Sequence, residues 1–540
     1  MNILGITHPI SWNPAACLLI DGELVAFAEE ERFVRLKHAP HVAPHNAIAL
    51  CLRRAGIDAS QIDITAIGFQ RPEAGGLRAM LNQSDVTRLT NDEFFEYRSS
   101  LAVLHADSQL MTFGRREYFD HHLCHAASAA IPSGFARANV ITLDGWGGAS
   151  SGMFGTFNRQ GQIEKIADVS PYSSWGNTYE LVTDYLGFRA HSGEGKTMGL
   201  ASYGQNDPAL LPNFCEGPFS LPNVRKYEHF LASTFERRKY GEELTDRHRN
   251  LAATVQSQYE QSLVTIARTL AEETGISKFV LAGGVALNCT GNGHLARQEF
   301  VEDIFIQPAS HDAGTALGAA ILAHRQATEA WPSFTFHHAY WGAEFTSDEI
   351  QAALVFAKVP YQPCDPCTTA AQALAQNQVI GWFQGAAEVG PRALGHRSIL
   401  AHPGYSGNVE HINKHVKRRE PWRPLAPSVL AERFHDIFEL PLLSPFMLMA
   451  APVRDAWRNR LAAIVHVDHS ARPQAVEVET NPTFHRMIGC FENLTGLPAV
   501  LNTSFNLDDE PLVNSPEHAI ATFYRSGLDV LIMGNFVVRK

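Results

Sequence analysis

The sequence lacks the features that would place it in a membrane, outside the cell or on nucleic acid. No stretch approaches the roughly 20 apolar residues that a membrane span needs, and the first residues form no basic signal segment. The eight cysteines are irregularly spaced, without paired CxxC sets, which favours reduced thiols. The net charge of −12 argues against a broad nucleic-acid surface. We therefore expect a cytoplasmic protein with no membrane or nucleic-acid partner.

The chain is long enough for more than one domain. Its 540 residues, 45% of them hydrophobic, suffice for two or three domains with substantial cores. Residues 325–365 are less periodic and are rich in aromatic residues and proline, which is typical of a linker. We place the domain boundary there, with residues 1–345 in one domain and residues 346–540 in the other.

A concentrated group of basic residues follows this boundary, in residues 381–403 and 412–429. A predicted strand over residues 379–383 leads into a glycine-rich loop, and we expect a helix to open at Arg392 or Ala393, with its free N–H groups facing an anion. The cations are Arg392, Arg397, Lys414, Lys417, Arg418, Arg419 and Arg423. They serve either an internal carboxylate or a phosphorylated ligand. The alternative, a solvated face of surface ion pairs, does not explain the glycines and Pro391.

Two histidines and two aspartates are candidate metal ligands. His121 and His125 project from one face of a helix predicted to begin just after Phe119, a spacing suited to one metal ion. Asp144 ends the predicted strand VITLD and opens a glycine-rich loop. Asp312 lies between a predicted strand and a helix, where an unpaired carboxylate is costly to bury. The alternatives are that His122 is the odd ligand, or that all three histidines are ordinary core residues.

Several turns are suited to a nucleotide or a phosphate. Residues 191–204 form a glycine-rich turn with Lys196, but they lack the full P-loop pattern. Residues 278–296 form a strand, a Gly283-Gly284 turn and a helix with Asn288 in its first turns. A polar turn in residues 498–516 carries Asn502 and Ser504, which are hydrogen-bonding groups and weak nucleophiles without a nearby base. A polar turn without a ligand is the alternative for that segment.

These motifs together resemble the NodU/CmcH family of ATP-dependent O-carbamoyltransferases, and within it the tobramycin carbamoyltransferase type most. The resemblance covers nearly the whole chain, and its motifs occur in family order: AFAEEERFVRLKH, DHHLCHAASA, GEGKTMGLASYG, LAGGVALNC, HDAGTALGAA, GPRALGHRSIL, VKRREPWRPLAPSV and NTSFN. It implies an α/β protein with an actin-like (ASKHA) N-terminal domain, similar to the transferase that makes threonylcarbamoyladenosine in tRNA. The implied C-terminal domain is an α/β YrdC-like domain.

The resemblance also implies an activity. The C-terminal domain would form carbamoyl-adenylate and pyrophosphate from carbamoyl phosphate and ATP, and the N-terminal domain would pass the carbamoyl group to an acceptor hydroxyl. A divalent metal, iron(II) in relatives with manganese or magnesium as alternatives, would be held by His121, His125, Asp144 and Asp312. The predicted catalytic residues are His8, Lys37, Arg392, Lys417 and Arg423. The predicted cofactor-binding residues are Lys196, Gly283, Gly284, Asn288, Gly314, Arg472, Asn502 and Ser504.

The chain departs from the family pattern at two places. Trp12-Asn13 stands where relatives carry a His-Asp pair, and neither side chain takes a proton at neutral pH. His8, His38 or the metal site must then act as the base, and we slightly favour His8. Ala386 stands where many relatives carry arginine, so one phosphate contact is missing or replaced.

The acceptor is expected to be a small natural product, an antibiotic or a sugar, and the protein a monomer or homodimer. Residues 70–117 and 205–250 match the family pattern least, and we expect them to shape the acceptor cleft. The alternatives are transfer to tRNA or another macromolecule, which the acidic balance disfavours, and a nucleotide-binding regulator without turnover.

Overall fold

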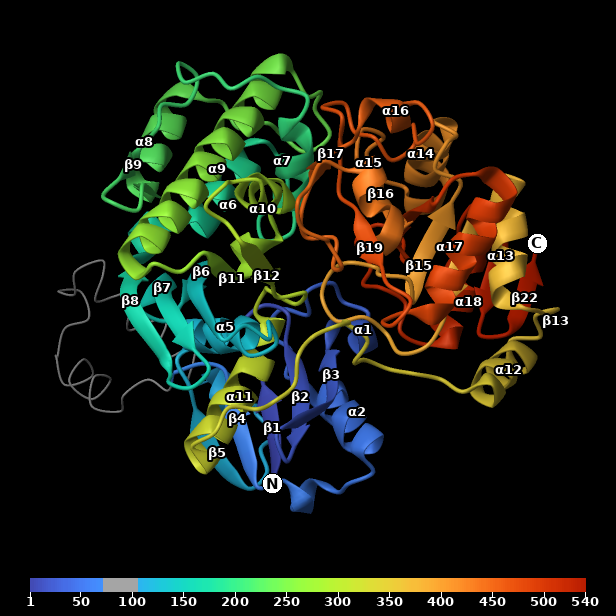
Figure 1. The fold of residues 1–540 in the computed structure, drawn as a ribbon, viewed down its shortest axis with the longest axis horizontal. Helices are drawn as coiled ribbons and strands as arrows, with labels where there is room; N and C mark the ends of the chain where they lie inside the picture. Colours follow the sequence, from blue (N-terminus) through green and yellow to red (C-terminus); the bar gives the residue numbers. More distant parts are fainter. Residues whose placement is uncertain (71–104) are drawn as a thin grey trace.

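The computed structural model describes residues 1–70 and 105–540. Figure 1 shows the N-terminal part as two neighbouring lobes, with the C-terminal part beside them. Each N-terminal lobe is built on a five-stranded sheet, and the C-terminal part is built on an eight-stranded sheet.

The first sheet has the strand order β3-β2-β1-β4-β5. Its strands are β1 (Asn2–Ile6), β2 (Ala15–Ile20), β3 (Glu23–Glu29), β4 (Ile64–Ile67) and β5 (Arg115–Tyr118). The turn between β2 and β3 is made by Asp21 and Gly22, which both have positive φ angles, as a two-residue hairpin requires. Strands β1 to β3 are antiparallel neighbours, whereas β4 and β5 run parallel to β1.

The second sheet repeats this arrangement, with the order β12-β11-β6-β7-β8. Its strands are β6 (Arg137–Gly147), β7 (Ser150–Asn158), β8 (Ile163–Val169), β11 (Lys278–Ala282) and β12 (Asp303–Ile306). Again three strands form an antiparallel meander and two run parallel to the first of them. Two sheets with the same strand order and directions are the hallmark of the actin-like fold. The predicted fold class is confirmed.

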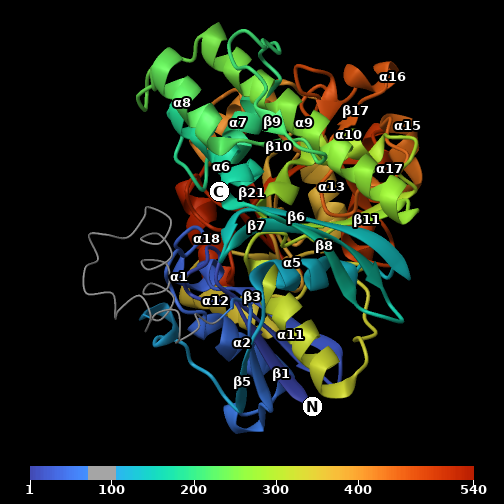
Figure 2. The same cartoon turned by 90° about the vertical axis from the view of Figure 1, so that its left-hand side faces the viewer.

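Two helices, α5 (His121–Ala130) and α11 (Ala313–Thr328), lie between these sheets and pack on each other. Figure 2 shows them between the strands of the two lobes. Small residues allow the close approach: a Cβ on Gly318 would lie 1.8 Å from the Cys124 carbonyl oxygen, and one on Gly5 would lie 2.0 Å from that of Ala316. This packing brings the first turns of α5 and α11 together.

The remaining N-terminal helices cover the outer faces. Helix α2 packs on β2 and β3, and α6 and α9 pack on β6. These helices are α1 (Glu31–Val34), α2 (His45–Ala55), α6 (Trp175–Tyr185), α7 (Glu194–Ala201), α8 (Val224–Thr234), α9 (Asp246–Thr274) and α10 (Cys289–Ala296). The short strands β9 (Cys215–Glu216) and β10 (Leu221–Pro222) pair beside them.

The C-terminal sheet has the order β13-β22-β21-β14-β15-β20-β16-β19. Its strands are β13 (Gln362–Pro363), β14 (Ile380–Phe383), β15 (Arg397–Ala401), β16 (Ala426–Leu430), β19 (Gln474–Val476), β20 (Ala499–Ser504), β21 (Val530–Met533) and β22 (Phe536–Arg539). The helices are α12 (Ser347–Phe356), α13 (Pro366–Ala375), α14 (Gly407–His411), α15 (Phe434–Ile437), α16 (Asp455–Arg458), α17 (Pro482–Thr495) and α18 (Pro516–Arg525). Strands β17 (Ala451–Pro452) and β18 (Ser470–Ala471) form a separate pair.

The predicted linker over residues 325–365 is only partly irregular. Helix α11 extends to Thr328, and α12 begins after Thr346, whose side chain forms a capping box with Glu349. The boundary at residue 345 stays a prediction, because one continuous hydrophobic cluster includes residues from both parts. Across the described residues, no helix combines the length and apolar character needed to cross a membrane.

Candidate active site

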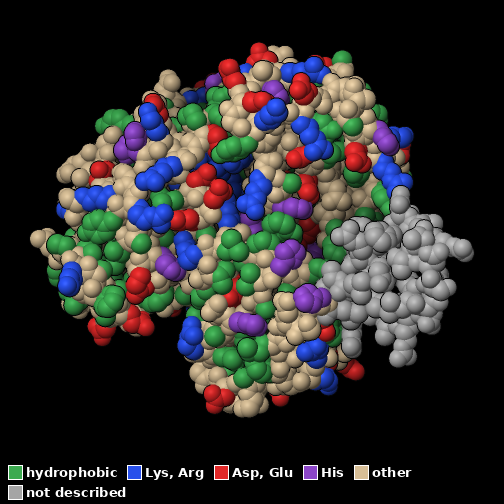
Figure 3. All heavy atoms as spheres, turned by 180° about the vertical axis from the view of Figure 1, so that it is seen from behind, with side chains coloured by type: hydrophobic (Ala, Val, Ile, Leu, Met, Phe, Trp, Pro, Cys, Tyr) green, Lys and Arg blue, Asp and Glu red, His purple; other side chains and the backbone are tan. Residues whose placement is uncertain are grey.

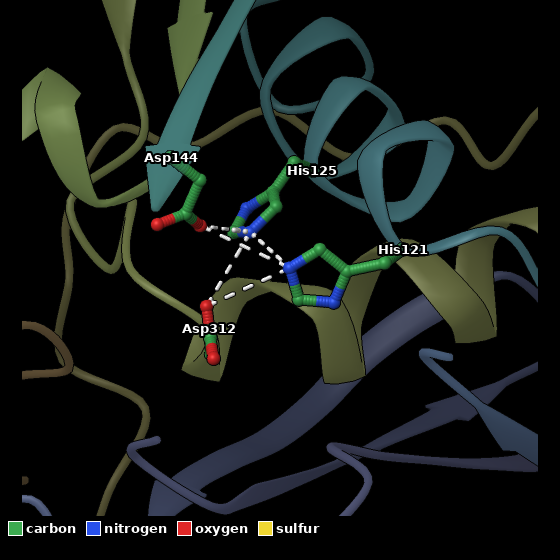
Figure 4. Close-up of side chains that lie close together, drawn as sticks. All are labelled: His121, His125, Asp144 and Asp312. Carbon is green, nitrogen blue, oxygen red and sulfur yellow. Dashed lines mark hydrogen bonds and ion pairs between the residues drawn. The ribbon is translucent and has the colours of Figure 1, made fainter. Parts of the chain in front are cut away.

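The four predicted metal ligands lie together where α5, β6 and the start of α11 meet (Figure 4). One ligand atom from each of His121, His125, Asp144 and Asp312 lies within 4.8 Å of the others. His121 and His125 occupy successive turns of α5, which begins at the N-cap Asp120. The sequence predicted that Asp144 opens a loop, and this is wrong. Strand β6 continues past Asp144 to Gly147 through an irregular register.

The geometry of these four side chains fits a shared cation. The two imidazole Nε2 atoms lie 3.1 Å apart, and His125 Nε2 lies 3.1 Å from Asp144 Oδ2. The two histidines lie within hydrogen-bonding distance of each other, whereas the Asp144 oxygen is buried and accepts no hydrogen bond from the described residues, which leaves it available to a cation. Two imidazoles and two carboxylates are ligands that suit iron, manganese or zinc.

Electrostatics within the cluster support the same interpretation. Burial opposes the charged form of His125, but the carboxylates of Asp144 and Asp312 raise its pKa to about 9. Burial alone would raise the pKa of Asp144, yet His121 and His125 hold it well below its usual range. The carboxylates that favour a proton on His125 would equally favour a bound cation.

His122 is not part of this group. Its Nε2 lies 3.0 Å from the Ser150 carbonyl oxygen, and burial, followed by His121, lowers its pKa to about 3. It is therefore a neutral core histidine that donates to a carbonyl. Asp312, by contrast, is held in place: its Oδ2 accepts the backbone N–H of Trp12 at 3.0 Å.

The glycine turn after β11 packs directly against the strand of Asp144. A Cβ on Gly283, which has a φ of 87°, would lie 2.2 Å from the Leu143 carbonyl oxygen, so only glycine fits there. Asn288 caps α10 by accepting the Gly291 N–H at 3.0 Å, and it exchanges hydrogen bonds with Gln256. The Asn288 side chain therefore forms hydrogen bonds within the protein that hold α10 in place.

The predicted helix at Arg392 or Ala393 is wrong. Residues 384–396 form a loop that leads directly into β15. Glu388 Oε1 accepts the N–H groups of Leu394, His396 and Arg397 at 2.8–3.0 Å, so those donors are used inside the loop. The loop therefore offers no helix N-terminus to an anion.

Arg397, one of the predicted basic cluster, is also turned away from any ligand. It is fully buried, donates to the Ala343 carbonyl oxygen at 3.0 Å and lies 3.7 Å above the Phe383 ring. The sequence offered two kinds of partner for these cations, an internal carboxylate or a phosphorylated ligand. Arg397 pairs directly with neither. Its Nη atoms donate to backbone carbonyls, while its buried Nε has no hydrogen-bond partner among the described residues.

Most of the other basic residues converge on one cavity of about 690 Å³, whereas Lys414 and Arg418 are exposed and do not line it. Its walls include Lys37, Arg392, Lys417, Arg419, Arg423 and Arg472. Burial, followed by the neighbouring Arg472, lowers the pKa of Arg392 to about 9, and burial, followed by Arg423, lowers that of Arg419 to about 9. These cations destabilise one another in the absence of an anion. We call this group the basic wall.

Lys417 is the most buried cation of the basic wall. It ends a π-helix, Ile412–Lys417, a rare element that is frequent at functional sites. Its Nζ donates to the side chains of Ser504 (2.9 Å) and Asn506. Burial, followed by Arg419, lowers its pKa well below the usual value. Arg423 is less crowded, since it faces Asp508 at 3.4 Å.

The cavity joins the basic wall to the metal cluster, because Asp144 and Asp312 also line it. Of the other predicted site residues, it is lined by Gly284, Asn288, Asn502 and Ser504. Figure 3 shows basic side chains gathered around a hollow near the middle of one face of the molecule. One continuous space therefore contacts both candidate sites.

Several predicted residues do not line this cavity. His8 is fully buried, and burial, the largest effect, lowers its pKa to about 4. Lys196 forms an ion pair with Glu420 at 2.7 Å, and Gly314 packs within α11 against the Ala309 carbonyl oxygen. Their site roles stay predictions. His38, the alternative base, does line the cavity, although burial lowers its pKa to about 4 as well.

Within the described residues, the two segments expected to shape the acceptor cleft are not found on the cavity wall. Residues 71–104 lie outside the described residues, and no residue of 205–250 lines the cavity. Sequence reasoning missed several groups that do: Trp12 and His191, whose rings lie 4.4 Å apart, and Glu180 and Glu194. No motif marks them, since their proximity arises from separate loops and helices.

Comparison with known proteins identifies the family. The family model described as "Carbamoyltransferase N-terminus" matches residues 2–321, and "Carbamoyltransferase C-terminus" matches residues 371–540. The chain belongs to the carbamoyltransferase family. The predicted NodU/CmcH membership is confirmed, whereas the likeness to the tobramycin type stays a prediction.

The relatives of this carbamoyltransferase carry names that indicate different roles. It is 37% identical to "Nodulation protein NolNO" of Sinorhizobium fredii over all of this chain and 80% of the relative. It is 32% identical to "3'-hydroxymethylcephem-O-carbamoyltransferase" of Amycolatopsis lactamdurans over 48% of each chain. Among solved structures, full-length HypF in the phosphate- and nucleotide-bound form matches 62% of this chain and 47% of its own, with 14% identity and a TM-score of 0.40.

Proposed function

We propose that this carbamoyltransferase is ATP-dependent and transfers a carbamoyl group to a hydroxyl of a small natural product. The observation that carries the proposal is the single cavity, which the basic wall and the metal cluster share. Carbamoyl phosphate and ATP bring several negative charges together, and phosphoryl and adenylyl transfer need fixed cations to neutralise them. The basic wall supplies these cations within one pocket.

The first half-reaction takes place at the basic wall. Water releases phosphate from carbamoyl phosphate to give carbamate, and a carbamate oxygen attacks the α-phosphorus of ATP. Pyrophosphate leaves, and carbamoyl-adenylate remains. Arg392, Arg419 and Arg472 hold the phosphates, while Lys417, fixed by Ser504 and Asn506, adds a hydrogen-bond donor on the same wall.

The second half-reaction takes place beside the metal cluster. The acceptor oxygen attacks the carbamoyl carbon, loses its proton and displaces AMP. His121, His125, Asp144 and Asp312 would hold a divalent cation, which polarises a carbonyl as a Lewis acid when bound. Of the histidines proposed as the base from the sequence, His38 lines the cavity and His8 does not, so His38 is the candidate to hold the acceptor proton.

Carbon-labelled carbamoyl phosphate tests this proposal against a panel of sugar and antibiotic alcohols, with and without ATP. We expect label in the acceptor, together with AMP, only when ATP and a divalent metal are both present. Label transfer without ATP would contradict the adenylate step, and transfer to tRNA alone would contradict the small-molecule acceptor.

A further inference from the structure

A buried ion pair from the N-terminal part forms hydrogen bonds with the loop that carries Arg392. Glu29 ends β3, Arg32 belongs to α1, and both side chains are nearly inaccessible to solvent. Glu29 Oε1 accepts the Gly390 N–H at 2.7 Å, and Arg32 Nη2 donates to the Gly390 carbonyl oxygen at 2.6 Å. Both polar groups of one glycine are therefore bound by side chains more than 350 residues away.

The same pair faces the loop that carries Asp312. Glu29 Oε2 lies 3.5 Å from His311 Nε2, so its two oxygens face the two loops separately. The loops also touch directly, since a Cβ on Gly390 would lie 2.3 Å from the Pro308 carbonyl oxygen. Gly390 has a φ of 88°, and Arg392 follows two residues later on the cavity wall.

The pair belongs to a small buried network of charged groups. Burial alone would raise the pKa of Glu29, but Arg32 and then His311 lower it below its usual value. Arg32 also faces Glu31 at 3.3 Å, and Glu31 in turn accepts the His38 N–H at 2.7 Å. Buried pairs of this kind contribute little net stability compared with apolar residues, so their presence calls for another explanation.

We propose that Glu29 and Arg32 are positioning residues that fix the Arg392 loop relative to the Asp312 loop. They thereby fix the site of the first half-reaction relative to that of the second. This inference rests on the proposed function for the role of Arg392. Glu29 and Arg32 also line the cavity, but their hydrogen bonds go to Gly390. Because effective transfer requires reacting groups placed to within about 1 Å, this pair controls the rate by holding both loops.

Arginine-to-lysine variants offer a matched test. Arg32→Lys keeps the buried charge but replaces the planar fork with a single ammonium, which cannot serve both partners in the same geometry. Arg35 is the control, since it lies in the same segment and donates to the Pro511 and Leu512 carbonyl oxygens on a different loop. Glu29→Gln is the second test variant and retains an acceptor oxygen.

Hydrogen–deuterium exchange measures how firmly Glu29 and Arg32 hold the Arg392 loop, and it does not require activity. We expect faster exchange in the peptide 388–397 for Arg32→Lys and Glu29→Gln, no change there for Arg35→Lys, and no change in β20 for any of the three. Unchanged exchange in 388–397, or an equal rise in Arg35→Lys, would overturn the proposal whatever the reaction is.

Carbamoyl-phosphate-dependent exchange of pyrophosphate into ATP tests the catalytic consequence. We expect Arg32→Lys to lower kcat/KM for carbamoyl phosphate about tenfold, and to cause no further loss when combined with Arg392→Ala, because both act through one side chain. Arg35→Lys should combine additively with Arg392→Ala. Losses that multiply for Arg32→Lys would overturn the positioning role, whereas an inactive wild type would count against the proposed function alone.

Discussion

Single residues decide which cations can bind a ligand. Arg392 and Arg397 are five positions apart in one motif, yet Arg392 lines the cavity and Arg397 is buried against carbonyls and Phe383. The sequence could not distinguish them, because loop geometry and not residue type sets their directions. The metal quartet was implied by the family resemblance and not by spacing alone, because only His121 and His125 share a segment, whereas Asp144 and Asp312 come from separate ones.

Arg392→Ala should abolish most adenylate formation. Removing one fixed donor to a developing charge typically costs about 100-fold or more in rate, and we expect that loss in carbamoyl-phosphate-dependent pyrophosphate release. Arg418→Ala is the control, because Arg418 is exposed, adjacent to Lys417 in sequence, and donates to the Arg525 carbonyl oxygen instead. Equal losses in the two variants would show that general charge, and not the pocket, matters.

Metal binding should depend on pH through His125. Its pKa of about 9 in the metal-free protein means that a proton must leave before a cation binds. The apparent affinity for Mn²⁺ should therefore rise about tenfold per pH unit between about pH 6 and about pH 8, and level off above the pKa. Calorimetry in two buffers of different ionisation enthalpy measures the released proton. An affinity that is independent of pH would contradict this account.

At the scale of elements, helices α5 and α11 create the metal cluster by close packing between two sheets. The sequence predicted a helix beginning just after Phe119 and a small-residue helix after Asp312, which correspond to α5 and α11. The predicted helix after residue 391 was wrong, because Glu388 binds three loop N–H groups that a helix would have used differently. Long-range hydrogen bonds of this kind leave no local sequence pattern.

Gly390→Ala should distort the loop between the two sites. Its Cβ would lie 2.3 Å from the Pro308 carbonyl oxygen at a φ of 88°, and such strain costs about 1–3 kcal/mol. Gly489→Ala, in α17 with open space around its Cβ, should instead stabilise the protein by up to about 1 kcal/mol. Urea unfolding compares the two. A neutral Gly390→Ala would show that this close contact has no energetic consequence.

At the scale of the whole molecule, two sites on different sheets share one cavity. The duplicated sheet order was only half visible in the sequence, because the first hairpin has a clear turn whereas the β6–β7 connection looks like a glycine-rich loop. The shared cavity could be expected from the family resemblance but not from any motif, since its walls come from both ends of the chain.

Polyanions should stabilise the folded protein. The basic wall has mutually repelling arginines, so pyrophosphate at about 100 times its Kd should add about 2.7 kcal/mol to the free energy of unfolding. Sodium chloride at the same ionic strength should not, and Arg472→Ala should weaken the effect. Equal stabilisation by both salts would indicate that no built anion site exists.

The central claim is that adenylate formation and carbamoyl transfer occur at two sites of one cavity. It is tested most directly by pyrophosphate release from ATP, with and without carbamoyl phosphate, in wild type, Arg392→Ala and His125→Ala. We predict release that depends on carbamoyl phosphate, is lost in Arg392→Ala and is kept in His125→Ala, which would fail only in transfer to the acceptor. Release that is lost equally in both variants would contradict two separable sites.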